Sequence, residues 1–231
     1  MTAANLGNVD VRETLTESFG GVAILNRSVH NSGMARPIEF DRPEAVNRAM
    51  ALFWRQGYQA TSLAGLLCVM GISRSSFYAA FGDKRRLFVE CLDLFARHTM
   101  DVLERTRAGM PPVDALQAFF ARDDRSPWGC MLVNTVLEMA GVDDDLAAHA
   151  SRHLGQVQRL FRTYLQDAGA APALAEDLAA MLMLVLQGVR VSSRRPLPAS
   201  ARLQSIATTF RLVRNAIATP TGSERTREIT A

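Results

Sequence analysis

Hydrophobic residues recur every three or four positions along most of this chain, with polar residues between them. That spacing is the period of an α-helix that buries one face, and no segment of the sequence shows the alternation typical of a half-buried strand. Gly and Pro residues separate the periodic segments. The pattern therefore predicts an all-α fold, with helices over 42–56, 62–70, 74–81, 83–106, 113–120, 130–140, 143–168, 172–189 and 199–217.

Two of the predicted helices are short and lie on either side of a Gly-containing turn, within the stretch 61–84. Thr61 is expected to cap the first helix, and Gly71 to end it in the left-handed conformation. Ser73 is expected to cap the second helix, which buries its phenylalanines and leaves its polar side chains outward. The stretch therefore predicts a helix-turn-helix, the unit that places its second helix in the major groove of DNA.

A third helix precedes this motif, with Asp41 as its expected cap and Gly57 as its end. Many positions of the resulting three-helix segment agree in order and spacing with one known family. On these residues, the segment 36–92 resembles the N-terminal domain of transcriptional regulators of the TetR family (TetR/AcrR type). The residues that carry the resemblance are Phe40-Asp41, Ala49, Phe53, Gly57-Tyr58, Ala60-Thr61-Ser62, Gly71-Ile72-Ser73, Phe77-Tyr78, Phe81, Asp83-Lys84 and Leu87-Phe88.

The apolar pattern and the resemblance together divide the chain into four parts. In chain order, they are a disordered or extended N-terminus, a helix-turn-helix DNA-binding domain, a helical domain for effector sensing and dimerisation, and a disordered tail. Met34 is an alternative start of the native chain, because the ordered pattern begins just after it. The four parts are residues 1–35, 36–92 (with the motif at 61–80), 93–217 and 218–231.

Seven residues of the motif region are candidate DNA contacts: Thr61, Ser62, Arg74, Ser75, Ser76, Tyr78 and Lys84. The three at the start of the second helix occupy the position from which a recognition helix reads bases. The two at the start of the first helix suit a phosphate oxygen. The resemblance implies that Tyr78 and Lys84 hold phosphates on the other side of the groove. The open alternative is that Thr61 is only a cap and Lys84 only a solvated charge.

Cys130 is a candidate sensor of electrophiles or oxidants. It follows Trp128-Gly129 at the predicted start of a helix, where the helix dipole favours a thiolate. The stretch 129–134 is similar to the region that holds the reactive cysteine in electrophile- and redox-sensing members of the family. The alternative is a buried cysteine that packs as a small hydrophobe. Cys68 and Cys91 lie on apolar helical faces and are expected to be packing residues.

Aromatic and Met residues of the later helices could line an adaptable effector pocket or equally form plain core. They are Phe119, Phe120, Trp128, Met131, Met139, Phe161 and Met181. His149 and His153 have a spacing that can bind a metal, but the sequence places no third ligand beside them. A solvated helix face is the favoured interpretation, and no metal or cofactor is expected.

Charge and composition argue against several classes of protein function. The chain has a net charge of +3, and residues 36–90 hold 8 Arg or Lys against 5 Asp or Glu. A phosphate-binding domain needs such an excess, whereas the nearly neutral remainder argues against a non-specific architectural DNA-binding protein. The later helices offer no cluster of acid, base or metal groups, which argues against an enzyme. Three scattered cysteines and the lack of a leader pattern indicate the cytoplasm, and the most apolar run, 179–189, is interrupted by Gln187 and Gly188 before it reaches the length of a membrane span.

The sequence therefore predicts a sequence-specific, DNA-binding transcriptional regulator. One short recognition helix makes too few contacts, so we expect a homodimer through the last two helices, with heads roughly 34–36 Å apart on a near-palindromic double-stranded operator. A repressor is expected, released when a small-molecule effector or modification of Cys130 tilts the helix 83–106. A transcriptional activator of the same family remains the alternative.

Overall fold

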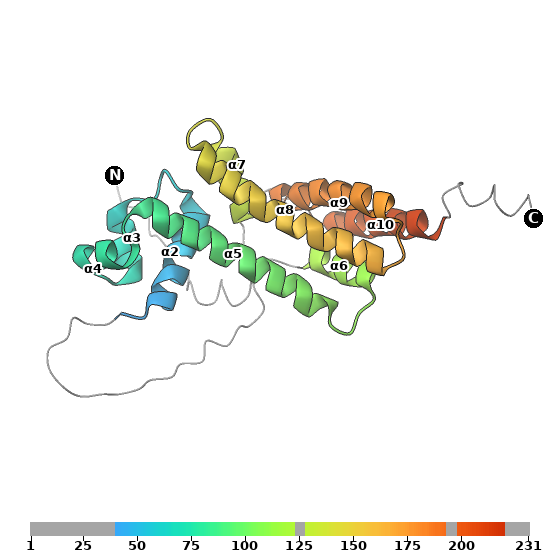
Figure 1. Cartoon of the computed structure of the whole chain (residues 1–231), viewed down its shortest axis with the longest axis horizontal. Helices are drawn as coiled ribbons and strands as arrows, with labels where there is room; N and C mark the ends of the chain where they lie inside the picture. Colours follow the sequence, from blue (N-terminus) through green and yellow to red (C-terminus); the bar gives the residue numbers. More distant parts are fainter. Residues whose placement is uncertain (1–39, 123–127, 193–197, 220–231) are drawn as a thin grey trace, which may run out of the picture. The chain divides into compact units, whose positions relative to one another are not determined.

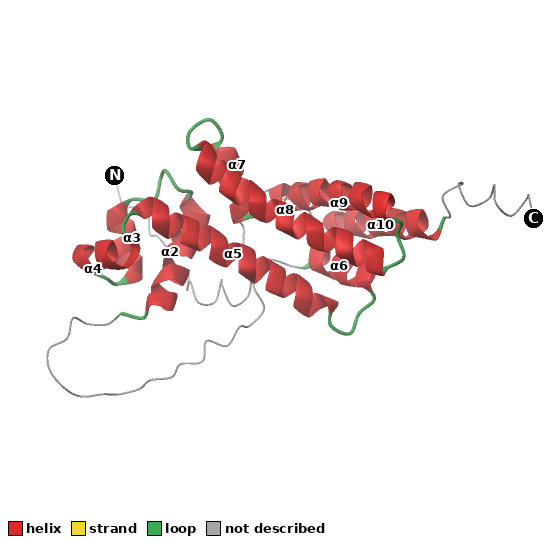
Figure 2. Cartoon of the chain, in the orientation of Figure 1, coloured by secondary structure: helices red, strands yellow, loops and turns green. Residues whose placement is uncertain are grey.

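The computed structural model describes residues 40–122, 128–192 and 198–219. Every secondary-structure element in these ranges is a helix (Figure 2), which confirms the all-α prediction. The predicted disordered N-terminus and most of the predicted tail lie outside the described residues. The helices follow one another along the chain (Figure 1) as α2 Arg42–Gln56, α3 Leu63–Met70, α4 Arg74–Phe81, α5 Lys84–Arg107, α6 Pro112–Ala121, α7 Met131–Met139, α8 Asp144–Asp167, α9 Pro172–Ser192 and α10 Ala199–Ala218.

The helix ends agree with the sequence signals, with one correction. The Asp41 side chain caps α2 by accepting a hydrogen bond from the backbone N–H of Glu44 at 3.0 Å, as expected. The cap of α3 is Ser62 rather than Thr61, because the hydroxyl of Ser62 accepts from the N–H of Gly65 at 3.0 Å. Thr61 lies one residue too early and is fully buried, and its hydroxyl donates instead to the carbonyl of Gly57 at 2.6 Å.

The described residues form two compact units. The first, here called the head unit, comprises residues 40–99 and 128–151; it contains α2, α3, α4, most of α5, α7 and the start of α8. The second, here called the body unit, comprises residues 100–122, 152–192 and 198–219. Helix α7 thus packs with the helix-turn-helix although it follows that motif by about 50 positions in the sequence.

The core of the head unit is aromatic. Phe53 of α2 packs edge-on against Phe88 of α5, with ring centres 4.8 Å apart. Phe77 and Phe81 of α4 are buried as the sequence predicts. Of the eight residues of α3, only Leu66 and Met70 are buried. Cys91 is buried as expected, but Cys68 is exposed, so the prediction that Cys68 is a packing residue is wrong.

The body unit buries a second aromatic cluster and leaves one apolar surface open. Phe119, Phe120, Phe161 and Phe210 form the cluster, with neighbouring ring centres 5.1 to 6.2 Å apart. On the last two helices, several large apolar side chains are exposed in the single chain, and such a surface in a globular protein marks an interaction site. They are Met181, Leu184 and Val191 of α9, and Leu203 and Leu212 of α10.

Helix α9 corrects one expectation from the sequence. It runs for 21 residues, and an 18-residue window of it reaches a mean hydropathy of 1.4, so length and composition alone would allow it to cross a membrane. Gln187 and Gly188 do not lower the mean enough to prevent this. Because the core helix of a soluble protein passes the same test, this property is weak support for a membrane span.

Candidate nucleic-acid interface

The turn between α3 and α4 has the geometry of a helix-turn-helix. Gly71 adopts φ +69° and ψ +32°, the left-handed conformation that a residue without a side chain reaches at little cost. Its N–H and that of Ile72 both donate to the carbonyl of Leu67, at 3.0 and 3.3 Å, which closes the end of α3. The two helices meet at an angle of 94°, within the range that DNA-reading helix pairs use.

Helix α4 presents a polar face over a buried aromatic one. Arg74 and Ser75 are exposed in its first turn, and Tyr78 is 48% exposed one turn later. The Ser73 hydroxyl caps the helix by accepting from the N–H of Ser76 at 3.1 Å. The same hydroxyl lies 2.9 Å from those of both Ser75 and Ser76, so these two side chains would exchange an internal hydrogen bond for one to DNA.

The other predicted contacts differ in their exposure. Ser62 is exposed at the N-terminus of α3, where a phosphate oxygen can approach. Thr61 has no exposed surface in this structure, which counts against its predicted phosphate contact. Lys84 places its Nζ 4.4 Å from the ring centre of Tyr58. Burial lowers the pKa of Lys84, and the negative charge of Glu138 acts in the opposite direction.

Cys130 occupies the N-cap position of α7, close to its predicted place. The residue keeps some exposed surface. Burial of the sulfur raises the pKa of the thiol, whereas the backbone N–H groups of Val133 and Leu132 favour the thiolate and act in the opposite direction. Because the effect of burial is the larger, the pKa of the thiol is raised in this conformation.

The residues predicted to line a pocket fall into two groups. Phe119, Phe120 and Phe161 are buried together in the body unit, and Met181 of the same unit is 38% exposed. The remaining three, Trp128, Met131 and Met139, belong to the head unit. An open hollow of about 650 Å³ in the body unit is lined by none of the seven; it lies against Pro111, Pro112, Val113, Asp114, Ala168, Gly169, Arg214, Ile217 and Ala218.

Two arginines of the body unit lie against the aromatic cluster. The guanidinium carbons of Arg122 and Arg190 are each 5.9 Å from the ring centre of Phe119. Burial, and then the charges of Arg122 and Arg202, lower the pKa of Arg190 to about 10. The described side chains of the cluster thus combine aromatic rings with cationic groups, which suits ligands that carry both apolar and anionic parts.

The histidine pair also has a partner that spacing in the sequence did not reveal. Nε2 of His149 lies 2.7 Å from Oδ1 of Asp93, on α5. Nδ1 of His153 lies 2.9 Å from Oε1 of Gln156, one turn further along α8. Both rings are therefore held by neighbouring side chains, and the long-range contact to Asp93 could not be read from the local pattern.

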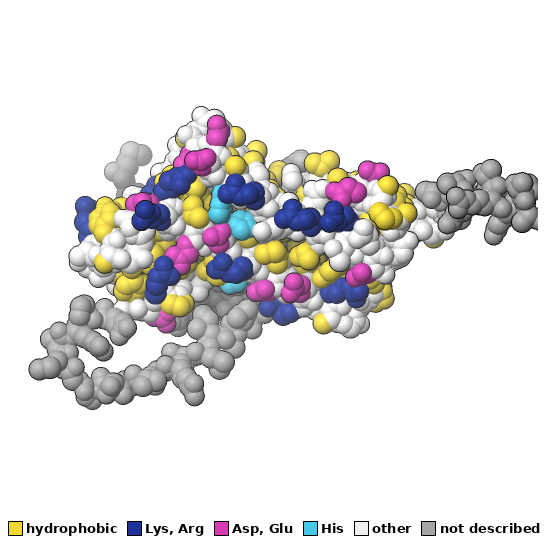
Figure 3. All heavy atoms as spheres, in the orientation of Figure 1, with side chains coloured by type: hydrophobic (Ala, Val, Ile, Leu, Met, Phe, Trp, Pro, Cys, Tyr) yellow, Lys and Arg dark blue, Asp and Glu magenta, His cyan; other side chains and the backbone are white. Residues whose placement is uncertain are grey.

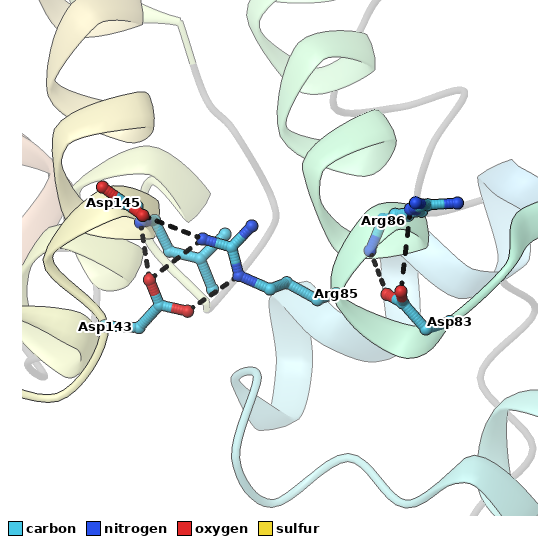
Figure 4. Close-up of polar contacts among 6 residues, drawn as sticks. Asp83, Arg85, Arg86, Asp143 and Asp145 are labelled. Carbon is cyan, nitrogen blue, oxygen red and sulfur yellow. Dashed lines mark hydrogen bonds and ion pairs between the residues drawn. The ribbon is translucent and has the colours of Figure 1, made fainter.

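Sequence reasoning also missed three charged residues of the head unit. Glu138 of α7 accepts from the backbone N–H groups of Tyr58 and Gln59, at 2.9 and 2.8 Å. Arg85 of α5 binds both carboxylate oxygens of Asp143, at 2.9 and 3.1 Å. Figure 4 shows the Arg85 guanidinium directed at Asp143 and Asp145, while Arg86 contacts Asp83, the residue just before α5. On the face seen in Figure 3, Lys and Arg side chains are interspersed with Asp and Glu. The ion pair between Arg85 and Asp143 therefore differs from other surface charges only in its two-oxygen geometry.

Two family descriptions match this chain. Residues 46–91 match "Bacterial regulatory proteins, tetR family", and residues 112–197 match "Transcriptional regulator LmrA/YxaF-like, C-terminal domain". A relative from Escherichia coli, the HTH-type transcriptional repressor ComR, is 32% identical over 193 residues, which cover 77% of this chain and 90% of ComR.

Solved structures of TetR-family regulators are also similar to this chain. A cysteine mutant of the TetR family transcriptional regulator CifR, complexed with 26-bp double-strand operator DNA, is 31% identical with a TM-score of 0.66, and the match covers 76% of this chain and 98% of CifR. A TetR-family regulator from Cytophaga hutchinsonii has a TM-score of 0.68 at 18% identity, over 77% of this chain and 95% of its own. The second likeness supports the fold alone.

Proposed function

Because this chain belongs to the TetR family of bacterial DNA-binding transcriptional regulators, we propose that it is a repressor that binds a near-palindromic operator as a homodimer. Its partner is double-stranded DNA, and its family consists of regulators rather than enzymes. We propose further that a small-molecule effector, or modification of Cys130, releases it from the operator in the cytoplasm. The observation that carries the proposal is the exposed polar turn of α4, with Arg74 and Ser75 over buried phenylalanines.

The proposed dimer uses the exposed apolar surface of α9 and α10. Leu184 is 69% exposed and Leu212 is 59% exposed in the single chain, values that burial against a second copy would reduce. A two-fold dimer also supplies the second recognition helix that specific binding needs, because two heads can occupy half-sites one turn of DNA apart.

Two release modes fit different parts of the molecule. The aromatic cluster around Phe119 supports an effector that enters the body unit, and the adjacent Arg122 and Arg190 favour one with anionic groups. The N-cap position of Cys130 supports modification instead, since a reagent that reaches the thiol of this partly exposed residue would disturb the start of α7. A thermal-shift screen of small ligands and electrophiles, run on the wild type and on Cys130→Ser, separates the two modes: only the second requires the cysteine.

DNA binding is tested with the Arg74→Ala variant, with Arg159→Ala as its control. Both changes remove one exposed arginine, but Arg159 lies on α8 in the body unit. Fluorescence anisotropy with DNA from upstream of the gene should show that Arg74→Ala weakens operator binding by about 10- to 100-fold, as expected for a lost base contact. The control should bind as the wild type does. Equal loss on operator and competitor DNA, with a steep dependence on salt, would instead indicate non-specific binding.

A further inference from the structure

The loop that joins α2 to α3 fixes the entry to the helix-turn-helix. Gly57 ends α2 with φ +84°, and its N–H donates to the carbonyl of Phe53 at 2.7 Å. The buried hydroxyl of Thr61 donates to the carbonyl of Gly57 and closes the loop from the other side. Ser62 follows immediately as the cap of α3. The conformation of residues 57–61 therefore sets where α3 begins.

A carboxylate from outside the helix-turn-helix holds this loop. Glu138 binds two consecutive backbone N–H groups, those of Tyr58 and Gln59, with one oxygen each, at 2.9 and 2.8 Å. Hydrogen bonds to an ionised acceptor are stronger than those between neutral groups. Gly57 makes the approach possible, because a Cβ there would lie 2.8 Å from Oε2 and 2.9 Å from Oε1 of Glu138.

The segment that carries Glu138 also contacts α2 before α7 and α5 after it. Before α7, the carbonyl of Gly129 accepts from Nε1 of Trp54 on α2 at 3.0 Å. After α7, Asp143 pairs with Arg85 at the start of α5 (Figure 4). Glu138 lies between these two contacts, so together they connect residues 128–146 to α2, to the loop that precedes α3, and to the start of α5.

We propose that Glu138 is a positioning residue for DNA binding. It lies outside residues 46–91, which match the tetR-family description, yet it holds the loop from which α3 and α4 are placed. It does not contact DNA itself. It supplies two fixed acceptors, so that the loop is already ordered when the protein meets its operator. This role rests on the DNA binding of the chain, and not on either proposed release mode.

Substitution of Glu138 distinguishes positioning from contact. In Glu138→Gln, the side chain keeps its size but offers one acceptor and one donor to two N–H groups, so one hydrogen bond is lost. We expect operator affinity to fall by about tenfold, since bonds to charged groups contribute on that order. The dependence of binding on salt should keep the wild-type slope, because no phosphate contact is removed.

Glu90→Gln is the matched control. Glu90 forms a two-oxygen pair with Arg42, but this pair joins α5 to the first turn of α2 and leaves the 57–61 loop untouched. Glu90→Gln should retain operator affinity within about twofold even where its melting temperature falls as far as that of Glu138→Gln. If Glu138→Gln binds as the wild type does, or if both variants lose affinity in proportion to their loss of stability, the proposal is wrong.

Amide hydrogen exchange supplies a readout that does not depend on DNA. In full-length Glu138→Gln, exchange at Tyr58 or Gln59, whichever amide loses its acceptor, should accelerate by at least about tenfold, while α3 and α4 keep their protection. Unchanged protection at these two amides would overturn the proposed role even if DNA binding had weakened. A wild-type chain that fails to bind the upstream DNA would contradict the proposed function instead, and exchange would still decide whether Glu138 holds the loop. Should Glu138→Gln fail to fold, Glu138→Asp is tested in the same two assays: its shorter side chain lets the carboxylate reach at most one N–H.

Discussion

At Gly57, two independent constraints exclude a side chain. The backbone has φ +84°, and a Cβ would collide with the Glu138 carboxylate at 2.8 Å. Gly57→Ala should therefore lower the free energy of unfolding by about 2–4 kcal/mol, of which about 1–3 kcal/mol comes from the backbone conformation, because φ +84° and ψ 173° define a region that is essentially restricted to glycine. Urea denaturation measures the loss.

Gly109 serves as a comparison site, because a substitution there tests the cost of a positive φ without a steric contact. It has φ +79°, but among the described residues no atom beyond its two chain neighbours lies within 4 Å of a Cβ built at this position. Gly109→Ala should consequently lose only about 1–2 kcal/mol. Equal losses in the two variants would mean that the contact between Gly57 and Glu138 contributes nothing.

The pH dependence of Cys130 alkylation tests its surroundings. Burial raises the pKa of this thiol, so its thiolate fraction should still be rising at a pH where that of a free cysteine, with a pKa of about 8.5, is levelling off. The rate with iodoacetamide is best followed by mass spectrometry in a Cys68→Ser background, because Cys68 is exposed. A rate that levels off near neutral pH would show a thiol with a depressed pKa and contradict this expectation.

At the scale of the helix, the apolar pattern predicted most of the architecture. The expected helices agree with α2 to α10 to within a few residues at each end, because Gly, Pro and capping residues stand where the periodic segments stop. The error at Thr61 has a local cause. Thr61 and Ser62 are both good capping residues, and only the buried hydrogen bond from Thr61 to Gly57 decides between them.

In the candidate site, the sequence predicted only those residues whose partners lie close to them in the chain. The exposed residues of α4 follow from one helical period, whereas Glu138 contacts a loop about 80 positions earlier in the chain. No spacing rule connects such residues, and one glutamate on an amphipathic helix resembles any solvated charge. The contact between His149 and Asp93 could not be predicted for the same reason.

The contact between α5 and the start of α8 should be sensitive to acid. The Arg85 guanidinium lowers the pKa of Asp143, and the N–H of Leu146 acts in the same direction. In the unfolded chain, an Asp carboxyl group has a pKa near 4. When folding lowers that pKa, the ionised group stabilises the folded protein at pH values above the unfolded pKa, and the stabilisation is lost as the pH falls through the folded pKa. Asp143→Asn should therefore be less stable than the wild type at pH 7, and the difference should shrink as the pH falls through the folded pKa of Asp143.

Asp145→Asn is the control for this pH series. Asp145 also faces Arg85, but its nearest oxygen is 3.8 Å away and its side chain is 96% exposed. Its substitution should leave the urea midpoint nearly unchanged at every pH. A pH-independent difference between Asp143→Asn and the wild type would show that the ion pair is not the cause.

At the scale of the whole molecule, the exposed leucines of α9 and α10 test the proposed dimer. Leu184→Glu combined with Leu212→Glu places two charges on the apolar surface and should give a monomer by light scattering. Operator affinity should then fall by at least about tenfold, because the two heads no longer bind as one unit. Leu137→Glu is the control. Leu137 is 73% exposed but lies on α7, outside the proposed interface, so the Leu137→Glu variant should remain dimeric.

The contact of Glu138 with the backbone of residues 57–59 also matters for chimeras that combine the DNA-binding part of one regulator with the sensing part of another. A chimera that joins residues 40–92 of this chain to the sensing part of another regulator would leave the N–H groups of Tyr58 and Gln59 without their carboxylate. The transplantable unit is instead discontinuous in sequence, since it needs residues 128–146 as well. Exchanges of DNA specificity among these regulators should therefore succeed most readily between chains that both have a glutamate at this position of α7 and a glycine at the end of α2.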